Sequence, residues 1–109
     1  VGHFSIEIGD DVWTGHHVYI TDQNHDYRDI SSPIGRQSMP EKPVKIGSGS
    51  WIGFGSVILP GAEIGEHVVS GANSVVAGPI PSYSVAVGAP ARVIRRFENG
   101  DWVSVDETA

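Results

Sequence analysis

The chain has 109 residues, room for one domain, and it carries 7 Lys and Arg against 13 Asp and Glu, a formal net charge of −6. This acidic balance argues against general binding to nucleic acids, because phosphate backbones favour positively charged protein surfaces. The absence of cysteine excludes disulfides and thiolate zinc sites and fits a reducing cytoplasm.

A six-residue period begins near the start of the chain. It reads IGDDVW from Ile8, TGHHVY from Thr14 and ITDQNH from Ile20. Such a period matches neither an α-helix nor a simple alternating strand, but it suits a short strand followed by a tight corner. Because no unit this short can bury its apolar face alone, the pattern predicts a solenoid of stacked coils.

The period is interrupted between Asp22 and Pro43, so that Ile20 and Ile46 are out of step by two residues. The interval is rich in Asn, Asp, Ser and Gly and contains three prolines, a composition that predicts a loop extruded from the coil. A loop of this length in a compact domain is usually functional, and a tolerated surface insertion is the alternative.

His25 stands where the period breaks, between two acidic residues, Asp22 and Asp26. Histidine is the residue type best suited to remove a proton near neutral pH, and neighbouring carboxylates can orient the ring and stabilise its charged form. His25 is therefore a candidate general base, and a polar surface residue is the alternative.

The period resumes at Ile46 and reads IGSGSW, IGFGSV, ILPGAE, IGEHVV, SGANSV and VAGPIP. We expect the opening aliphatic residue of each unit to point into the core, the small fifth residue to fill a crowded corner, and the sixth to face outward. Ser70 replaces the aliphatic residue of its unit, so its buried hydroxyl must find a hydrogen-bond partner. His67 falls at an outward position and is predicted to be a solvated surface residue.

A basic cluster of three arginines lies at the end of the repeat (Arg92, Arg95, Arg96). It could hold a small polyanionic ligand, or the arginines could pair with the acidic residues that follow them. Asn99-Gly100 predicts a two-residue hairpin turn, and we expect this hairpin to cap the last coil.

Four features, in this order, resemble the hexapeptide-repeat acyltransferases of the maltose/galactoside O-acetyltransferase type: the hexads, the interrupting loop with its histidine, Trp-Ile-Gly at residues 51–53, and Gly-Ala-Pro-Ala-Arg-Val-Ile-Arg at residues 88–95. The resemblance covers about residues 8–96. It implies an all-β fold, a left-handed parallel β-helix with an extruded loop and a short C-terminal hairpin cap. It implies a single domain over residues 1–109, with the loop at about 22–43 and the cap and tail over 97–109. It also implies a homotrimer with active sites between subunits.

The same resemblance implies roles for individual residues. His25 matches the general base, which takes a proton from a sugar or glycan hydroxyl as that hydroxyl attacks the thioester carbonyl of acetyl-CoA, and no metal is implied. His17 stands where the family contacts the acceptor. A backbone N–H within residues 52–55 is the expected donor to the oxyanion. The residues that match cofactor-binding positions are Trp51, Phe54, Ala72, Arg92 and Arg95. Trp51 could instead form part of a subunit contact.

Two departures from the family pattern, and the start of the chain, bear on these roles. Ala77-Gly78 replaces a Thr-Lys pair, which removes one cationic contact to the cofactor phosphates. His17 replaces an asparagine, so the acceptor can differ. N-acetylation of an amino sugar is an alternative to transfer to a hydroxyl. Because the chain starts at Val1, close to the repeat, we expect that further sequence precedes it in the natural protein.

Two other functions fit the same pattern. A zinc enzyme of the gamma carbonic anhydrase kind would need three converging histidines, for which His16, His17 and His25 are the candidates. Adjacent histidines in one strand point to opposite sides, which argues against that arrangement. A non-catalytic trimeric scaffold is the third alternative, favoured by the missing lysine.

Overall fold

The computed structural model describes residues 6–38 and 42–105. In that part of the chain the fold is all-β, and its single helix is a 3-10 turn, η1 (Ile34–Arg36). The strands before η1 are β1 (Ile6–Ile8), β2 (Trp13–Thr14) and β3 (Tyr19–Ile20). Those after it are β4 (Val44–Ile46), β5 (Trp51–Ile52), β6 (Val57–Ile58), β7 (Glu63–Ile64), β8 (Val69–Ser70), β9 (Val75–Val76), β10 (Pro79–Ile80), β11 (Ser84–Val87), β12 (Arg92–Glu98) and β13 (Asp101–Ser104).

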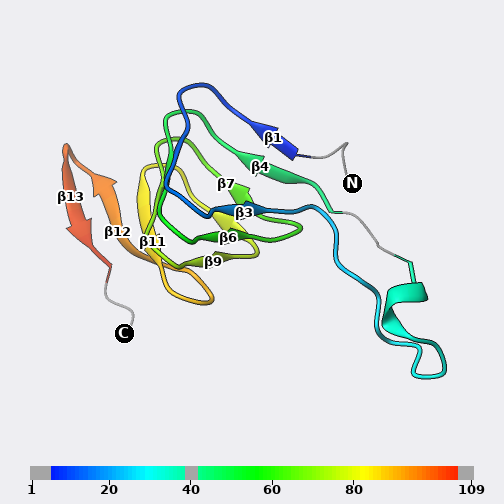
Figure 1. Ribbon diagram of the computed structural model, residues 1–109. Coiled ribbons are helices and arrows are strands. Elements are labelled where there is room, and N and C mark those ends of the chain that lie inside the picture. Colours follow the sequence, from blue (N-terminus) through cyan, green and yellow to red (C-terminus); the bar gives the residue numbers. More distant parts are fainter. Residues whose placement is uncertain (1–5, 39–41, 106–109) are drawn as a thin grey trace.

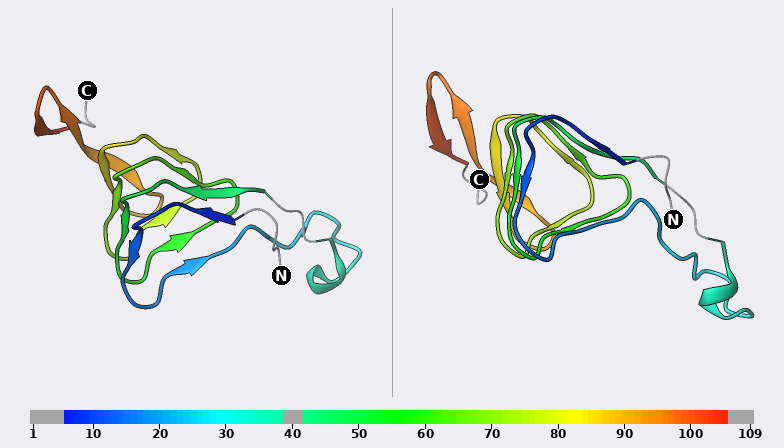
Figure 2. Two further views of the ribbon diagram at one scale, coloured as in Figure 1. Left: turned by 90° about the horizontal axis from the view of Figure 1, so that it is seen from above. Right: turned by 45° about the horizontal axis from the view of Figure 1, so that its top comes forward.

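The strands form three sheets around a triangular coil (Figures 1 and 2). Sheet A has the order β1-β4-β7-β10, sheet B the order β13-β12-β11-β8-β5-β2, and sheet C the order β3-β6-β9. Each of the first three circuits adds one strand to each sheet, and the last adds β10 to sheet A and β11 to sheet B. Strands of successive coils pair in parallel, as Lys45 does with Glu63. The all-β architecture of parallel strands predicted from the period is confirmed.

The interior of the coil is filled by the first and fifth residues of the hexads. The opening residues Ile46, Ile52, Ile58 and Ile64 are at most 2% exposed, and the small fifth residues, such as Ser56, are buried with them. The Ser70 hydroxyl finds the partner that its position requires, because its Oγ lies 3.3 Å from Ser56 Oγ. The predicted inward positions are therefore confirmed after the arm, whereas Ile8, which opens the first hexad, is 51% exposed.

Glycines at the second hexad position are required by the close stacking of the coils. A Cβ atom built on Gly47 would lie 2.4 Å from the carbonyl oxygen of Gly65 in the next coil, and one on Gly53 would lie 2.7 Å from that of Ser70. Real Cβ atoms do not approach a backbone oxygen so closely, so a larger residue would push the coils apart.

The insertion between β3 and β4, here called the arm, projects from the coil, as the break in the period predicts (cyan in Figures 1 and 2). It leaves the stacking intact, because Ile8 before the arm pairs with Ile46 after it. Its base is closed by the Lys42 N–H, which donates to the Asp22 carbonyl oxygen at 2.9 Å. The arm is thus an addition to one corner of the coil, between sheets C and A.

The chain leaves the coil earlier than the hexads indicate. The last circuit is two residues short, since Ile64 pairs with Ile80, and the chain then reverses so that β12 runs antiparallel to β11 from Arg92 onward. The hairpin of β12 and β13 turns at Asn99 and Gly100, whose φ angles of 51° and 81° are those of the predicted two-residue turn. The expected tail, residues 106–109, lies outside the described residues.

Stacked rings join this hairpin to the coil. The imidazole of His67 lies 5.8 Å from the Tyr83 ring and 6.4 Å from the Trp102 ring of β13, with both pairs close to parallel. Phe97 meets Trp102 at 5.4 Å. His67 is exposed, as predicted, but it also contributes to the packing of the hairpin.

Candidate functional site

The corner between sheets B and C brings three of the candidate residues together. His17, Phe54 and Ala72 occupy this corner in three successive coils, which are linked by hydrogen bonds from Gly55 N to His16 O (3.0 Å) and from Asn73 N to Phe54 O (2.7 Å). The His17 and Phe54 rings are in contact, with 5.5 Å between their centroids and 80° between their planes. Phe54 and Ala72 lie in register, and His17 lies one residue further along its own coil, level with Gly55. The proposed acceptor-binding residue and two proposed cofactor-binding residues thus share one corner, and this group is here called the B–C corner column.

The backbone N–H of Phe54 is an open donor in this column, as are those of His17 and Ala72 among the described residues. The N–H groups of Gly53 and Gly55 are already used, donating to Ser70 O and His16 O. No hydrogen bond from the Phe54 N–H is found among the described residues. Among the three corner residues 53–55, Phe54 is therefore the one whose N–H is open to act as the expected oxyanion donor.

The A–B corner shows why the Phe54 N–H is left open. There, the N–H at the same hexad position donates to a serine hydroxyl in the next coil: Asp10 to Ser48 Oγ at 3.0 Å, and Glu66 to Ser82 Oγ at 2.9 Å. The corresponding residue above Phe54 is Ala72, which has no side-chain oxygen. Sequence reasoning missed this difference between the two corners. It could have been predicted from the third hexad position, which is serine in Ser48 at the A–B corner but alanine in Ala72 at the B–C corner.

Trp51 and Arg95 lie in one row along the outer face of sheet B. The row is set by the register that pairs Trp51 with Val69, Val69 with Val85, and Val85 with Arg95. Trp51 is 56% exposed, as its sixth position in the hexad predicts. At the other end of the row Trp13, which pairs with Trp51, is 75% exposed. The sequence analysis overlooked Trp13, which also occupies the sixth position of its hexad.

Arg92 and Arg95 are both exposed on β12. Arg92 pairs with Val87, directly after the turn at Gly88 that continues the B–C corner. In residues 6–38 and 42–105 the one ion pair joins Arg28 to Asp26, so the arginines of β12 do not pair there with the acidic residues that follow them. Their positive charges remain available to an anionic ligand.

His25 lies elsewhere, on the arm. It is exposed, and the structure shows no hydrogen bond to its ring from the residues described. Because the arm leaves from the corner between sheets C and A, sheet C separates its origin from the B–C corner column (Figure 2). Within one chain the candidate base and the candidate cofactor-binding residues are therefore not brought together.

The two carboxylates expected to orient His25 differ sharply. Asp26 accepts two hydrogen bonds from the Arg28 guanidinium, at 2.9 Å and 2.7 Å, and these hold the pKa of its carboxyl well below the usual range. Asp22 is buried, and its Oδ2 has no hydrogen-bond partner among the residues described. Asp26 is thus committed to Arg28, whereas Asp22 is free to accept a hydrogen bond.

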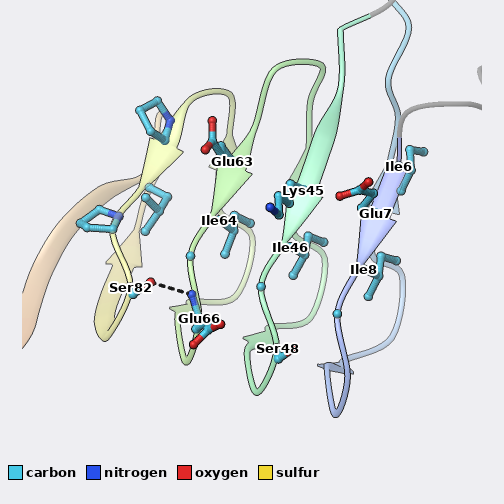
Figure 3. A pocket seen from close by; sticks show the side chains of 16 residues that line it. Ile6, Glu7, Ile8, Lys45, Ile46, Ser48, Glu63, Ile64, Glu66 and Ser82 are labelled. Carbon is cyan, nitrogen blue, oxygen red and sulfur yellow. Dashed lines mark hydrogen bonds between the residues drawn. The ribbon is translucent and has the colours of Figure 1, made fainter.

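A groove of about 1030 Å³ crosses sheet A (Figure 3). It is lined by β1, β4, β7 and β10 and carries a row of alternating charges, Glu7, Lys45 and Glu63, which pair in register. Of the described residues, those that line it include none of the candidate site residues. The groove is therefore separate from the B–C corner column.

In the described ranges, no group of three or more His, Cys, Asp or Glu side chains is placed to hold a metal ion. The same residues include no helix with the length and apolar character needed to cross a membrane.

Comparison with known proteins identifies the repeat. Residues 43–78 match the family model of the bacterial transferase hexapeptide, which comprises six repeats. A probable acetyltransferase of Mycobacterium tuberculosis is 45% identical over 93 residues, which cover 85% of this chain and 31% of the relative.

Two solved structures share the fold. A galactoside acetyltransferase in complex with coenzyme A superimposes with a TM-score of 0.77 and 31% identity, covering 96% of this chain and 55% of that one. A maltose O-acetyltransferase from Clostridium difficile gives a TM-score of 0.73 and 32% identity, covering 88% and 61%. The resemblance to hexapeptide-repeat acyltransferases is confirmed, and the chain spans less than two thirds of the length of each of these proteins.

Proposed function

We propose that this chain, which resembles the hexapeptide-repeat acyltransferases, forms the repeat-bearing part of an acetyl-CoA-dependent O-acetyltransferase. The acceptor would be a hydroxyl group of a sugar or glycan. The proposal is supported by the similarity to maltose and galactoside acetyltransferases and by the chemistry available at the B–C corner column. The observation that carries it is the open Phe54 N–H, a donor at the same corner as an exposed aromatic row and two arginines that form no ion pair within residues 6–38 and 42–105.

Acetyl-CoA would lie along the B–C corner and sheet B. Arg92 and Arg95 supply two positive charges for the nucleotide phosphates at one end of the site. Trp51 offers an exposed aromatic wall, and the backbone at Phe54 and Ala72 is open to the pantetheine and acyl groups. The Phe54 N–H is suited to stabilise negative charge on the thioester oxygen during transfer.

His25 would act as the general base. Its imidazole takes the proton of the acceptor hydroxyl as the hydroxyl oxygen attacks the thioester carbonyl. The tetrahedral intermediate then breaks its C–S bond, and the CoA thiolate takes the proton from the imidazolium, so acetyl ester and free thiol are the products. His17, in contact with Phe54, is placed to bind the acceptor beside the acyl group.

The separation of His25 from the B–C corner column favours a site shared between copies of the chain. An arm that projects from one corner can reach the B–C corner of a neighbour, and exposed Trp13 and Trp51 provide apolar surface for such a contact. A homotrimer of left-handed β-helices, as the resemblance implies, meets this requirement.

Calorimetry and kinetics together test the proposal. We expect CoA to bind the wild-type protein, and His25→Ala to lose transfer to a sugar acceptor by at least about 100-fold while CoA affinity and oligomeric state are unchanged. His67→Ala, which alters an exposed histidine on another corner, is the matched control and should retain turnover. A protein that binds no CoA would instead be a scaffold, and full turnover in His25→Ala would remove His25 from the role of base.

A further inference from the structure

Trp13 is the most exposed aromatic side chain among the described residues, with 75% of its surface accessible. It stands at the sixth position of its hexad in β2, so its indole lies on the outer face of sheet B. None of the other described aromatic rings is in contact with it. Burial of so large an apolar surface is favourable, so its exposure favours a partner that lies outside the coil.

The place of Trp13 in the row along sheet B indicates what that partner is. Trp13 pairs with Trp51, Trp51 pairs with Val69, and the row ends at Arg95. In the proposed site Arg95 binds the cofactor phosphates, and Trp51 borders the arm that carries the acetyl group. Neighbouring strands of a sheet lie about 4.8 Å apart, so Trp13 lies about that distance beyond the acyl end of the row, where the acceptor must approach.

The coil that carries Trp13 also carries His17, the proposed acceptor-binding residue. His17 lies at the B–C corner, and its ring meets the Phe54 ring with 5.5 Å between their centroids. Trp13 lies four residues earlier, on the flat face of sheet B. This coil therefore offers the acceptor two separate contacts, a hydrogen-bonding ring at the corner and a flat apolar ring on the sheet.

The surface between these two contacts has no side chain at its middle. Gly15 lies midway between Trp13 and His17, and a Cβ atom built on it would lie 2.8 Å from the backbone nitrogen of Phe54. The stacking of the coils therefore requires glycine at this position. A ligand bound at the corner can extend over Gly15 toward Trp13, but it must be longer than one sugar ring to contact both residues.

We propose that Trp13 is a specificity-determining residue that selects oligosaccharide acceptors, an inference that rests on the proposed acetyl transfer. His17 binds the sugar unit whose hydroxyl is acetylated. The next unit packs the apolar C–H face of its ring on the indole of Trp13, whose N–H can donate to a hydroxyl group of that unit. The acceptor is therefore a chain of at least two sugar units, and Trp13 does not touch the reacting atoms.

Kinetics with acceptors of increasing length test this role. The full-length protein and acetyl-CoA are combined with mono-, di- and trisaccharides of glucose, galactose and glucosamine, and we expect wild type to prefer the di- and trisaccharides. Trp13→Ala should raise the KM for these by about tenfold, while kcat, the kinetics with monosaccharides and the Kd for CoA stay within about twofold of wild type. Trp13→Phe, which keeps a smaller ring, should lose less.

Tyr19→Ala is the matched control. It removes the exposed aromatic ring at the sixth position of the next hexad in the same coil, which lies on sheet C instead of sheet B. Its preference for di- and trisaccharides should equal that of wild type. Because little of the Trp13 surface is buried, the Tm of Trp13→Ala should stay within about two degrees of wild type, whereas a purely structural role would lower it.

Nitrogen-15 NMR of the indole N–H groups detects the contact without turnover. The chain has three tryptophans, and Trp13→Phe assigns the Trp13 signal. In wild type bound to CoA, we expect the disaccharide that is acetylated best to shift this signal, and the corresponding monosaccharide to shift it less. The signal of Trp102, which packs against His67 and Phe97, should not move.

Three outcomes would overturn the inference: a wild-type protein that shows no preference for the longer sugars, a Trp13→Ala variant that keeps this preference, or a Trp13 signal that no saccharide shifts. If Trp13→Ala changes the oligomeric state measured by light scattering and lowers turnover of every acceptor alike, Trp13 is a subunit contact and the inference is wrong. If Trp13→Ala does not fold, Trp13→Phe and the indole spectrum decide.

The two proposals fail differently. Transfer that does not depend on the length of the acceptor rejects only the role of Trp13. A protein that acetylates none of these sugars rejects the proposed acetyl transfer, and the role of Trp13 with it.

Discussion

The imidazole of His17 meets the Phe54 ring of the next coil nearly at right angles, with 5.5 Å between the ring centroids. These residues are far apart in the sequence, and only the stacking of the coil before the arm on the coil after it places them in contact. The contact joins the proposed acceptor-binding residue to the proposed cofactor-binding backbone, so it locates the point at which the two substrates would meet.

Changing His17 to asparagine should affect the acceptor alone. The amide keeps a hydrogen-bonding group but loses the ring contact with Phe54, so we expect the KM for the acceptor to change by about threefold to tenfold with the Kd for CoA unchanged. Steady-state kinetics and calorimetry measure the two constants. His16→Asn is the control at the adjacent position. A loss of CoA affinity in His17→Asn would contradict the separation of roles.

Ala72→Ser should close the open donor of the B–C corner column. At the A–B corner a serine in the next coil accepts the corresponding N–H at 2.9–3.0 Å, so the new hydroxyl can accept the Phe54 N–H in the same way. One added hydrogen bond is worth about 0.5–1.5 kcal/mol, so Tm should rise slightly while kcat/KM for acetyl-CoA falls by about threefold to tenfold.

The control for this experiment is Ala72→Val, which adds apolar atoms at the same exposed position but no hydrogen-bond acceptor. Unchanged acetyl-CoA kinetics in Ala72→Ser, combined with a raised Tm, would show that the Phe54 N–H does not serve the reaction.

Gly47→Ala should destabilise the coil because the new Cβ would lie 2.4 Å from Gly65 O. Overpacking of this kind costs about 1–3 kcal/mol or more, which lowers the Tm measured by calorimetry by several degrees. Gly78→Ala is the matched control, since no atom lies within 4 Å of its Cβ position, and its Tm should stay within about one degree of wild type. Equal Tm values for the two variants would mean that the coils can separate without penalty.

Gly78→Lys should strengthen cofactor binding. It restores the cationic residue expected from the resemblance, at a position of the C–A corner with open space for a side chain. In the proposed trimer this corner would meet the B–C corner of a neighbouring copy. An exposed charge pair contributes up to about 1 kcal/mol, so we expect the Kd for CoA to fall by about twofold to fivefold at low salt, with less effect at high salt. Gly78→Gln, which matches the size but not the charge, should bind CoA as wild type does. An equal gain in both variants would rule out an electrostatic cause.

The six-residue period was sufficient to predict the coil, its core and the arm. Inward positions such as Ile52 and Ile58 follow from a local pattern of large apolar and small residues, and the strands have no other way to bury them. The hairpin turn at Asn99 and Gly100 could also be predicted from the sequence, because a turn with positive φ at both positions strongly favours these residue types. The roles of His25, Trp51, Arg92 and Arg95 remain predictions, as does the assembly that would unite them.

Only the tertiary structure shows which groups of different coils come into contact. Whether the Phe54 N–H is free depends on which residue lies above it, and whether Asp22 has a partner depends on how the arm leaves the coil. A hydrogen bond needs both groups within about 3 Å. Local sequence specifies each short strand and corner, but it does not specify which groups of distant coils come within that distance.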